Sequence, residues 1–380
     1  MSQYWLYPGL PSPAAQFLGR CAFVLLAWGS TCAAAGGLDR TAQSLSPLFE
    51  KGRYVGVDGY YSRPSVQGRD AMGFSTGDVA PSYGQWGLSY KQDLSPQLSM
   101  ALMLTRPFGL HIRYDRSASP LLGGTEVKLS TRELQGVLRY KFNAQWGVHG
   151  GLRLQQSHGS VTLQGMAYGA ALGGYHVKFA RSTEPGYLLG ISYEQPDIAL
   201  RVVATYYSAI RHRVQTTENL WPGSTQTAST SPQTFNLDVQ TGITASALLF
   251  GQIRWGNWEA FELRPQAFAT ITRGKSLTDL DNAITYTLGL AQKFSPQWTG
   301  FVALAHDKKS PSMPLSPLRP SSGRQGYTLG LVYDNEVVKI SPWVSYQRLG
   351  GAEVSTTQTP MARFGKSSAT VFGIQMGYHF

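Results

Sequence analysis

Apolar and polar residues alternate with a period of two residues from Arg53 to the end of the chain. Trp146, Val148 and Leu152, for example, fall on one side of an extended segment, and basic and amide side chains fall on the other. This period is typical of β-strands that place one face against an apolar phase. The pattern therefore predicts an all-β chain built from many strands of this kind.

The connections between the predicted strands are of two kinds. Six short connections alternate strictly with seven much longer ones. A transmembrane β-barrel produces this alternation because it has turns on one side of the membrane and loops on the other. The sequence thus predicts a transmembrane antiparallel β-barrel of about 14 strands with both termini in the periplasm. The predicted strands are Arg53–Ser62, Gly84–Gln92, Gln97–Thr105, Val127–Lys141, Trp146–Ser157, Tyr187–Glu194, Ile198–Ser208, Thr234–Gly242, Ser246–Gly256, Ile284–Lys293, Gln297–His306, Gly326–Asp334, Val338–Arg348 and Val371–Phe380.

Composition agrees with a chain that faces lipid. Charged residues make up 14% of the chain, against about 25% in soluble domains. The longest apolar run, Cys21–Trp28, has eight residues, whereas a membrane-spanning helix needs about 20. This excludes a helical membrane protein, and the 12% of aromatic residues argues against disorder.

The N-terminal segment has the pattern of a secretory signal. Residues 1–34 are the expected signal peptide, 35–51 a short plug or hatch, and 52–380 the barrel. Both cysteines, Cys21 and Cys32, fall within the signal, so the mature chain has no thiol. Loss of Arg20 leaves 32 Lys and Arg against 22 Asp and Glu, a net charge of +10. Such a charge suits lipopolysaccharide phosphates or anionic solutes as partners, whereas export and dispersed basic residues argue against nucleic acid.

Motifs that could carry chemistry are weak. Gly73–Gly77 matches G-x-S-x-G, but neither a preceding strand nor a following helix is predicted, as a hydrolase elbow requires. The seven histidines lack metal-ligand spacing. Asp279–Asn282 offers carboxylates in a long loop but lacks the glycine and final glutamate of a calcium loop. We expect no enzyme, no cofactor and no metal site.

Charged residues recur on the inward face of the predicted strands. Two interpretations are open: opposite charges that brace the wall, or arginines that bind an anionic head group beside apolar residues that hold its tail. The candidate substrate-binding residues on this face are Arg139, Arg153, Arg201, Arg254, Phe250 and Met103.

Several segments resemble a known family. They are Phe235–Gly242, Leu248–Trp255, Ala35–Arg40, Tyr286–Gly289 and Gly377–Phe380. With them the chain resembles the FadL/TodX family of outer-membrane transporters, in a branch with a short hatch. About seventeen residues precede the first predicted strand, and the Asn-Pro-Ala signature of the longer-hatch branch is absent from the sequence.

The resemblance implies a monomeric barrel of fourteen strands whose periplasmic end is closed by an N-terminal hatch. Long-chain fatty acids or other hydrophobic compounds, including aromatic hydrocarbons, would bind near the extracellular loops. They would pass to an interior site and leave sideways through a gap in the wall, without ATP. The family's interior site could not be matched residue by residue, so the six candidates above come from strand parity alone.

The expected function is passive uptake of hydrophobic compounds across the outer membrane of a Gram-negative bacterium, with long-chain fatty acids as the first substrate class. A transporter of aromatic hydrocarbons and a general diffusion porin are the alternatives. A porin would favour an open polar lumen, which the apolar inward positions disfavour. An adhesin stays open because seven long loops face outward.

Overall fold

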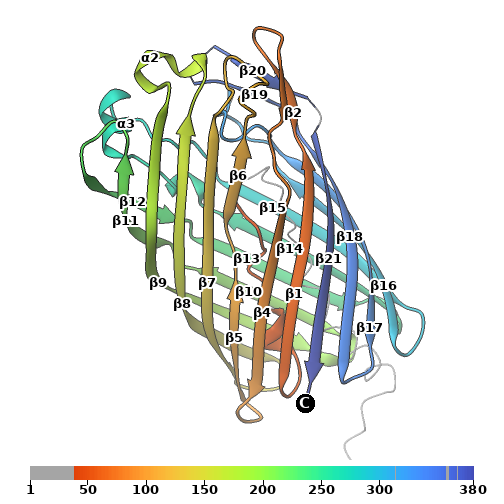
Figure 1. The fold of residues 1–380 in the computed structure, drawn as a ribbon. Coiled ribbons are helices and arrows are strands. Elements are labelled where there is room, and N and C mark those ends of the chain that lie inside the picture. The colour runs from red at the N-terminus through yellow and green to blue at the C-terminus, as the bar shows by residue number, and fades with distance from the viewer. Residues whose placement is uncertain (1–37, 313, 357–358, 366) are drawn as a thin grey trace, which may run out of the picture.

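The computed structural model of the protein describes residues 38–312, 314–356, 359–365 and 367–380. The expected signal peptide therefore lies outside the described residues. Figure 1 shows a tall barrel with the C-terminus among the short turns at one end and the long loops at the other. In the part of the chain that the structure describes, no helix has both the length and the apolar character needed to cross a membrane.

Fourteen antiparallel strands of the described chain form a closed ring. The ring closes where β1 pairs with β21 in an unbroken register from Tyr54–His379 to Ser65–Ser368. Closure satisfies the backbone groups that a sheet edge would expose. Each ring strand corresponds to one predicted strand. In ring order they are β1 (Tyr54–Ser65), β4 (Tyr83–Asp93), β5 (Leu98–Thr105), β7 (Glu126–Lys141), β8 (Trp146–Leu163), β9 (Tyr175–Gln195), β10 (Leu200–Tyr207), β13 (Thr234–Gly242), β14 (Ala247–Gly256), β15 (Ala283–Lys293), β16 (Trp298–Asp307), β17 (Arg324–Asp334), β18 (Val338–Leu349) and β21 (Ser367–His379).

Some segments predicted as loops are strands. β8 and β9 continue well beyond their predicted ends, and the predicted loop 209–233 contains the hairpin of β11 (Ile210–Glu218) and β12 (Ser224–Ser231). Alternate residues of β11 are buried, and β11 pairs with β9 over Thr216–Glu218. The wall on this side therefore extends above the ring. Buried and exposed positions still alternate there, but the residues are mostly polar, so the sequence predicts a solvated loop.

Smaller elements cover the loop end of the ring. A second sheet lies there in the order β19-β20-β2-β3. Figure 1 shows β2, β19 and β20 at the loop end, and α2 and α3 at the same end on the side of β8, β9 and β11. The remaining elements are η2 (Ser46–Phe49), β2 (Gln67–Asp70), β3 (Ser75–Asp78), β6 (Gly109–Arg113), η3 (Met166–Tyr168), α2 (Gly169–Leu172), η4 (Pro196–Ile198), η5 (Trp258–Ala260), α3 (Gln266–Ile271), β19 (Ala352–Val354) and β20 (Ala362–Phe364).

The outer wall is apolar between two levels rich in aromatic residues. Leu152, Leu189 and Leu329 have exposed fractions of 75%, 57% and 60%, which is the pattern of a lipid-facing surface. Exposed aromatic side chains beside the short turns are Tyr140, Phe142, Trp146, Phe294, Trp298, Tyr378 and Phe380. A second set nearer the loops, which we call the upper aromatic belt, consists of Tyr61, Trp86, Tyr187, Phe235, Tyr286, Tyr327, Tyr346 and Phe372.

We expect Leu152→Arg to weaken folding into a bilayer by about 2–4 kcal/mol, because it places a cation against hydrocarbon. Thr162→Arg, on the same strand but above the apolar surface, should cost much less. Urea-dependent folding into phospholipid vesicles, followed by heat-modifiable gel mobility, measures both free energies. Equal costs for the two substitutions would contradict a lipid-facing position for Leu152.

Candidate functional site

The third strand of the ring is interrupted, and the N-terminal segment fills the interruption. β5 ends at Thr105 and β6 begins at Gly109. At this break the Arg40 N–H donates to the Pro107 carbonyl at 2.7 Å, and the Gly109 N–H donates to the Leu38 carbonyl at 2.8 Å. The segment before β1 thus pairs with the wall from inside. We call residues 38–50 the hatch.

Above the break, the wall ladder between β4 and β6 is absent. β4 pairs with β5 only from Leu88 downward, and the pairs found for β6 are with β7. Among the described residues, the loop-side half of β4 has no backbone ladder on this side. The Gln85 side chain reaches across and donates to the Arg106 carbonyl at 3.0 Å. The wall therefore has a lateral interruption whose lower edge is the hatch contact.

The lower hatch is an apolar plug held by cations. Leu45, Leu48 and Phe49 pack in one buried cluster with wall residues. The Phe49 ring lies between two guanidinium groups, with Arg139 at 4.4 Å and Arg201 at 4.8 Å from its centroid. Such cation–π contacts gain strength when they are desolvated, as here. The plug therefore closes the lumen near the short-turn end.

Ion pairs fix both ends of the hatch. Arg254 bonds Asp39 at 2.7 Å and also the Gln43 side chain at 2.9 Å. At the other end, Glu50 accepts from Lys339 at 3.0 Å and lies 3.2 Å from the His379 ring nitrogen. Burial raises the pKa of Glu50, but the charges of Lys339 and His379 and their hydrogen bonds together outweigh it, and the net direction is downward. These buried pairs would leave strong uncompensated charges if one partner were lost.

The six residues predicted from parity are all buried inside the barrel. Arg139, Arg201 and Arg254 contact the hatch, and Arg139 also pairs with Glu194. Arg153, in contrast, forms its ion pair within the barrel wall. It pairs with Glu133 at 2.7 Å and donates to the Ser208 carbonyl at 3.0 Å.

The two apolar candidates lie apart from each other. Phe250 packs across Gly289, where a Cβ would meet its ring at 2.1 Å, in a cluster near the short turns. Met103 packs with the plug and lines a cavity beneath the hatch. The structure thus separates the predicted set into hatch contacts, a wall pair and two apolar positions.

An apolar cleft lies above the hatch, among the loops, with about 900 Å³ of empty space when the part open to solvent is included. Its walls come from the hatch, from β6 to β8 and from the long loops. A smaller cavity of about 530 Å³ adjoins it and shares Leu38, Leu129 and Leu263 with it. Aliphatic residues that line the cleft include Leu38, Val66, Leu110, Ile112, Val127, Val161, Leu277, Leu318 and Leu349.

A buried carboxylate fixes the loop that roofs the cleft. Glu218 accepts from the backbone N–H groups of Ala267 at 3.0 Å and Phe268 at 3.1 Å, at the start of α3. The Tyr175 hydroxyl donates to the same carboxylate at 2.7 Å. The loop is therefore tied to β9 and β11, and its apolar residues, such as Trp258, pack into the main core cluster.

The polar part of the cleft includes two arginines, together with His111, Thr278, Asp279, Ser316 and Ser321. Arg40 donates to the Gly109 carbonyl at 2.8 Å and lies 3.5 Å above the Tyr83 ring. Arg319 is 7% exposed, and its contact with Asp281 is long, at 3.5 Å. Its Nε has no hydrogen-bond partner among the described residues. Burial lowers the pKa of Arg319, and Asp281 offsets this only in part.

A second large cavity, also about 900 Å³, lies below Arg40. It is more polar than the cleft, and Asp58, Ser89 and Gln135 contribute to its walls. Arg40 lines both spaces, so the backbone around it separates them. A molecule in the cleft would have to displace this part of the hatch in order to reach the lower cavity.

Strand periodicity does not predict the cleft, because loops supply most of its lining. A signal was present in Pro314–Pro320, where Pro and Leu surround Arg319 in a predicted extracellular loop. A solvated loop is usually polar, so this composition indicates packing. Asp279–Asn282, considered for calcium, lies at the same place. Asp281 accepts from Ser310, from Ser312 at 2.7 Å and from Arg319.

A closed antiparallel barrel with an apolar outer wall, an internal plug and an apolar cleft among its loops defines an outer-membrane transport protein. The sequence profile of the family described as "Outer membrane protein transport protein (OMPP1/FadL/TodX)" matches residues 75–380. The chain belongs to this family. No protein with a curated description matches its sequence significantly.

Solved structures share this fold. A Pseudomonas aeruginosa FadL homologue superposes with a TM-score of 0.71 at 17% identity, over 93% of this chain and 97% of that one. The P. putida toluene transporter TodX gives 0.65 at 12% identity, over 91% and 99%. The Ralstonia pickettii toluene transporter TbuX gives 0.61 at 13% identity, over 94% and 100%. At these identities the likeness establishes the fold.

We expect Glu50→Ala to loosen the hatch, because it leaves Lys339 buried without its carboxylate. The cost is about 3–5 kcal/mol, which corresponds to at least a hundredfold rise in the open population. Planar-bilayer recordings should show small currents for the natural protein and frequent larger steps for the variant. Glu353→Ala, which removes a pair with the 77% exposed Arg363, is the matched control. Unchanged currents for Glu50→Ala would contradict this anchor.

Proposed function

We propose that the protein admits hydrophobic compounds through the outer membrane by passive diffusion, and that long-chain fatty acids are its substrates. The observation that carries the proposal is the apolar cleft beside Arg319. Its aliphatic lining, which includes Leu110, Ile112 and Leu318, suits an acyl chain, as ligand pockets are lined mainly by apolar side chains. No ATP or covalent step is needed, because the compound moves down its own gradient.

Arg319 is the proposed partner of the fatty-acid carboxylate. It is buried, its contact with Asp281 is long at 3.5 Å, and its Nε lacks a partner among the described residues. A guanidinium can bind a carboxylate through two parallel hydrogen bonds and keeps its charge when partly desolvated. The head group would sit at the loop side while the tail follows Leu110 and Ile112 toward the hatch.

The proposed exit is the lateral interruption between β4 and β6. It lies beside the cleft, because Tyr83 and the β6 residues Leu110 and Ile112 line the cleft wall. The route straight to the periplasm meets the plug around Phe49. A hydrophobic compound gains free energy by moving sideways into hydrocarbon, so the plug and the interruption together favour lateral release.

Most of the six predicted lumen residues receive a supporting role in this proposal. The four arginines hold the hatch or the wall, and Phe250 packs near the short turns. Met103, which lines the lower cavity, is the predicted residue that a tail would contact if the hatch shifted at Arg40.

Aromatic hydrocarbons are the second candidate substrate class. A neutral aromatic ring would bind the aliphatic lining of the cleft and would need no cation. The contacts that Arg40 makes with Tyr83 and Gly109 could then stay as they are. A general diffusion porin is disfavoured because the plug occupies the lumen.

We further propose that the protein functions as a monomer, with both termini on the periplasmic side. The C-terminus lies among the short turns, while the long loops cover the opposite end (Figure 1). Long loops face outward in transmembrane barrels of this kind. The outer leaflet would then surround the loop-side part of the wall, with lipopolysaccharide as the proposed lipid partner.

Uptake of labelled oleate tests the substrate class directly. Cells that lack their own transporter would carry this protein, with insertion checked by heat-modifiable gel mobility. We expect uptake well above the empty-vector control. No uptake despite proper insertion would exclude long-chain fatty acids, and toluene uptake in the same cells would then decide for the second class.

Replacement of Arg319 tests the head-group assignment. We expect Arg319→Gln to raise the half-saturating oleate concentration about tenfold, because a charge-assisted hydrogen bond is lost, while Arg319→Lys keeps most of the effect of the natural residue. Methyl oleate, which has no carboxylate, should be taken up equally by all three proteins. Arg363→Gln, on an exposed arginine outside the cleft, is the control. An equal loss for oleate and methyl oleate would contradict the assignment.

A further inference from the structure

The upper aromatic belt is interrupted on one side of the barrel. On β7 and β8, the described outward positions above Leu134 and Leu154 carry basic, amide, hydroxyl and imidazole groups and one carboxylate, Glu126, but no Phe, Tyr or Trp. Seven exposed basic residues lie on the outward faces of β6, β7, β9 and β11 instead. We call them the basic band: Arg113, Lys128, Arg132, Lys178, Arg181, Arg211 and Arg213.

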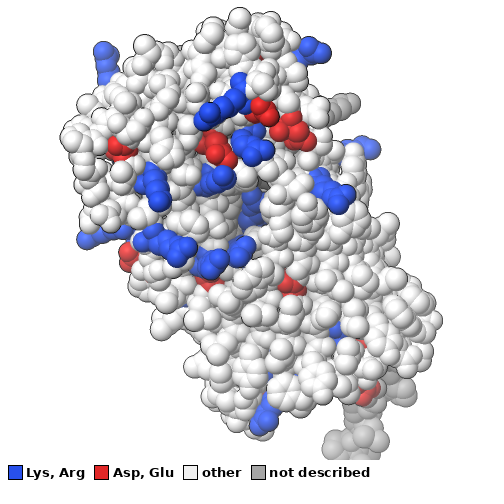
Figure 2. All heavy atoms as spheres, in the orientation of Figure 1, with Lys and Arg blue, Asp and Glu red and all other residues white. Residues whose placement is uncertain are grey.

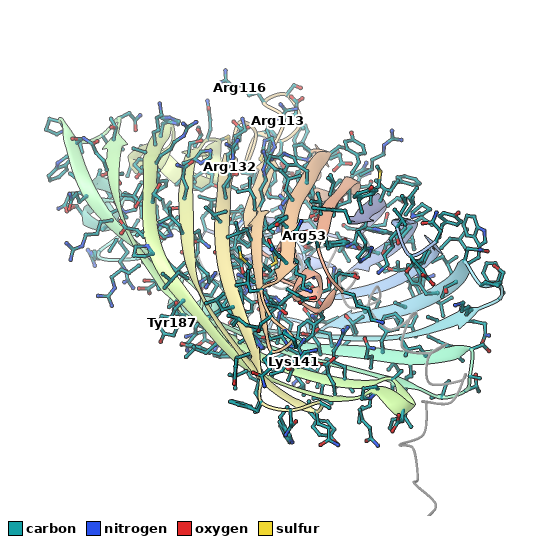
Figure 3. All side chains as sticks on the ribbon, turned by 90° about the horizontal axis from the view of Figure 1, so that it is seen from below. Arg53, Arg113, Arg116, Arg132, Lys141 and Tyr187 are labelled. Carbon is teal, nitrogen blue, oxygen red and sulfur yellow. The ribbon has the colours of Figure 1, made fainter. Side chains whose placement is uncertain are left out.

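Figure 2 shows where charge lies on one face of the molecule. Lys and Arg gather on its upper half around a hollow, with several Asp and Glu among them, and the lower half carries few charged groups. In Figure 3, Arg113 and Arg132 lie toward one side of the barrel, away from Lys141 beside the short turns. The basic band therefore lies on one side of the barrel, and on β7 it begins at the level of Arg132.

That level coincides with the upper edge of the apolar wall. β8 faces lipid from Trp146 to Leu154, which spans about 26 Å along the strand at about 3.3 Å per residue. With a tilt of about 40°, this is about 20 Å along the barrel axis, close to the apolar height of about 25 Å in transmembrane barrels. Arg132 lies one outward position above Leu134. The basic band therefore begins where hydrocarbon ends and lipid head groups begin.

The band has little compensating negative charge. On the same strands, Glu133, Glu184, Glu194 and Glu218 lie on the inward face. Glu126 is half-buried and contacts Lys128 at 2.8 Å and His111 at 3.1 Å, and the exposed Asp115 interacts electrostatically with Arg113. Lys128 and Lys178 occupy one row of the sheet, separated only by Ser160. Like charges held this close repel each other and are stabilised by an anion.

Electrostatic interactions link the residues in the middle of the band. Arg132 and Arg181 both act electrostatically on His158 at the bulge of β8, and Arg132 also acts on Arg106. His158 is half-buried and Arg106 lies 5.1 Å from the Trp86 ring. These groups add no carboxylate, so the centre of the band stays positive.

From these observations we infer that the basic band is a docking surface for the phosphate groups of lipopolysaccharide in the outer leaflet. The inference deepens the proposed orientation of the barrel and does not depend on the substrate that it carries. The acyl chains would lie against Leu134 and Leu154 below the band, and the phosphates would meet Arg132, Lys128 and Lys178 above them. Basic residues near a membrane attract anionic lipid at about 1 kcal/mol each.

Phosphorylated glycolipid fits the surface better than a soluble anion or a protein partner. The basic band lies directly above the lipid-facing wall. The wall can bind acyl chains, and the band above it can bind phosphates. A soluble anion would use only the upper part. An acidic protein would have to displace the surrounding lipid to reach residues at this level.

Binding of purified lipopolysaccharide to the purified, folded full-length protein in detergent tests the inference. We expect the natural protein to bind a lipopolysaccharide that carries both lipid A phosphates, and to bind its dephosphorylated form at least about tenfold more weakly. The variant with Lys128→Gln, Arg132→Gln, Lys178→Gln and Arg181→Gln should lose affinity for the phosphorylated form by a similar factor. Native mass spectrometry or surface plasmon resonance gives the affinities.

A matched control removes the same charge elsewhere, with Arg53→Gln, Lys141→Gln, Lys308→Gln and Lys309→Gln. Its affinity should equal that of the natural protein. Equal binding of the phosphorylated and dephosphorylated forms would overturn the inference, and so would equal loss in both variants. Because the first comparison uses the natural protein, it decides the question even if a variant folds poorly. Oleate uptake is measured separately, so a failure of the substrate proposal leaves this result intact.

Discussion

A backbone N–H or C=O that faces hydrocarbon must find its partner within the protein, and this requirement organises the whole molecule. Pairing of the first strand with the last closes the ring, and the interruption between β4 and β6 leaves an edge in the described wall. The break between β5 and β6 would expose such groups, but the hatch supplies partners for Pro107 and Gly109 at that point. The wall can therefore be interrupted only where another segment lies against it. The hatch is consequently part of the wall as well as a plug.

Electrostatics inside the barrel follow from the same exclusion of water. A buried arginine is tolerated when a carboxylate or an aromatic face lies beside it, and Arg153 with Glu133 and Arg139 with Phe49 are such cases. These contacts fix the interior but leave little of it available to a ligand. Arg319 differs because its carboxylate lies at 3.5 Å and already accepts from Ser310 and Ser312. Closely paired arginines therefore belong to the structural framework, whereas Arg319, whose charge is less well compensated, belongs to the candidate site.

Period-two alternation was enough to predict the strands of the ring, because a face against lipid and a face against the lumen differ at every position. For the same reason, the alternation predicts that the side chains of Arg254 and Met103 face the lumen of the barrel. It could not reveal what they contact, since the contacts of Arg254 with Asp39 and Gln43 span more than two hundred residues. The cleft escaped prediction because its lining comes from loops without a period. β12 was assigned to solvent because hydroxyl-rich strands lack an apolar signal, although Thr227 and Ser229 are buried.

The anchors of the hatch also constrain the order in which the protein can assemble. Glu50 contacts Lys339 and His379, which lie on the penultimate and last strands of the ring. Those residues are separated from it by 289 and 329 positions, and contacts of such separation form late because closing long loops costs entropy. Glu50 therefore reaches its final contacts only after the last two strands of the ring are in place. Biogenesis has to keep the N-terminal segment within the closing ring until that step.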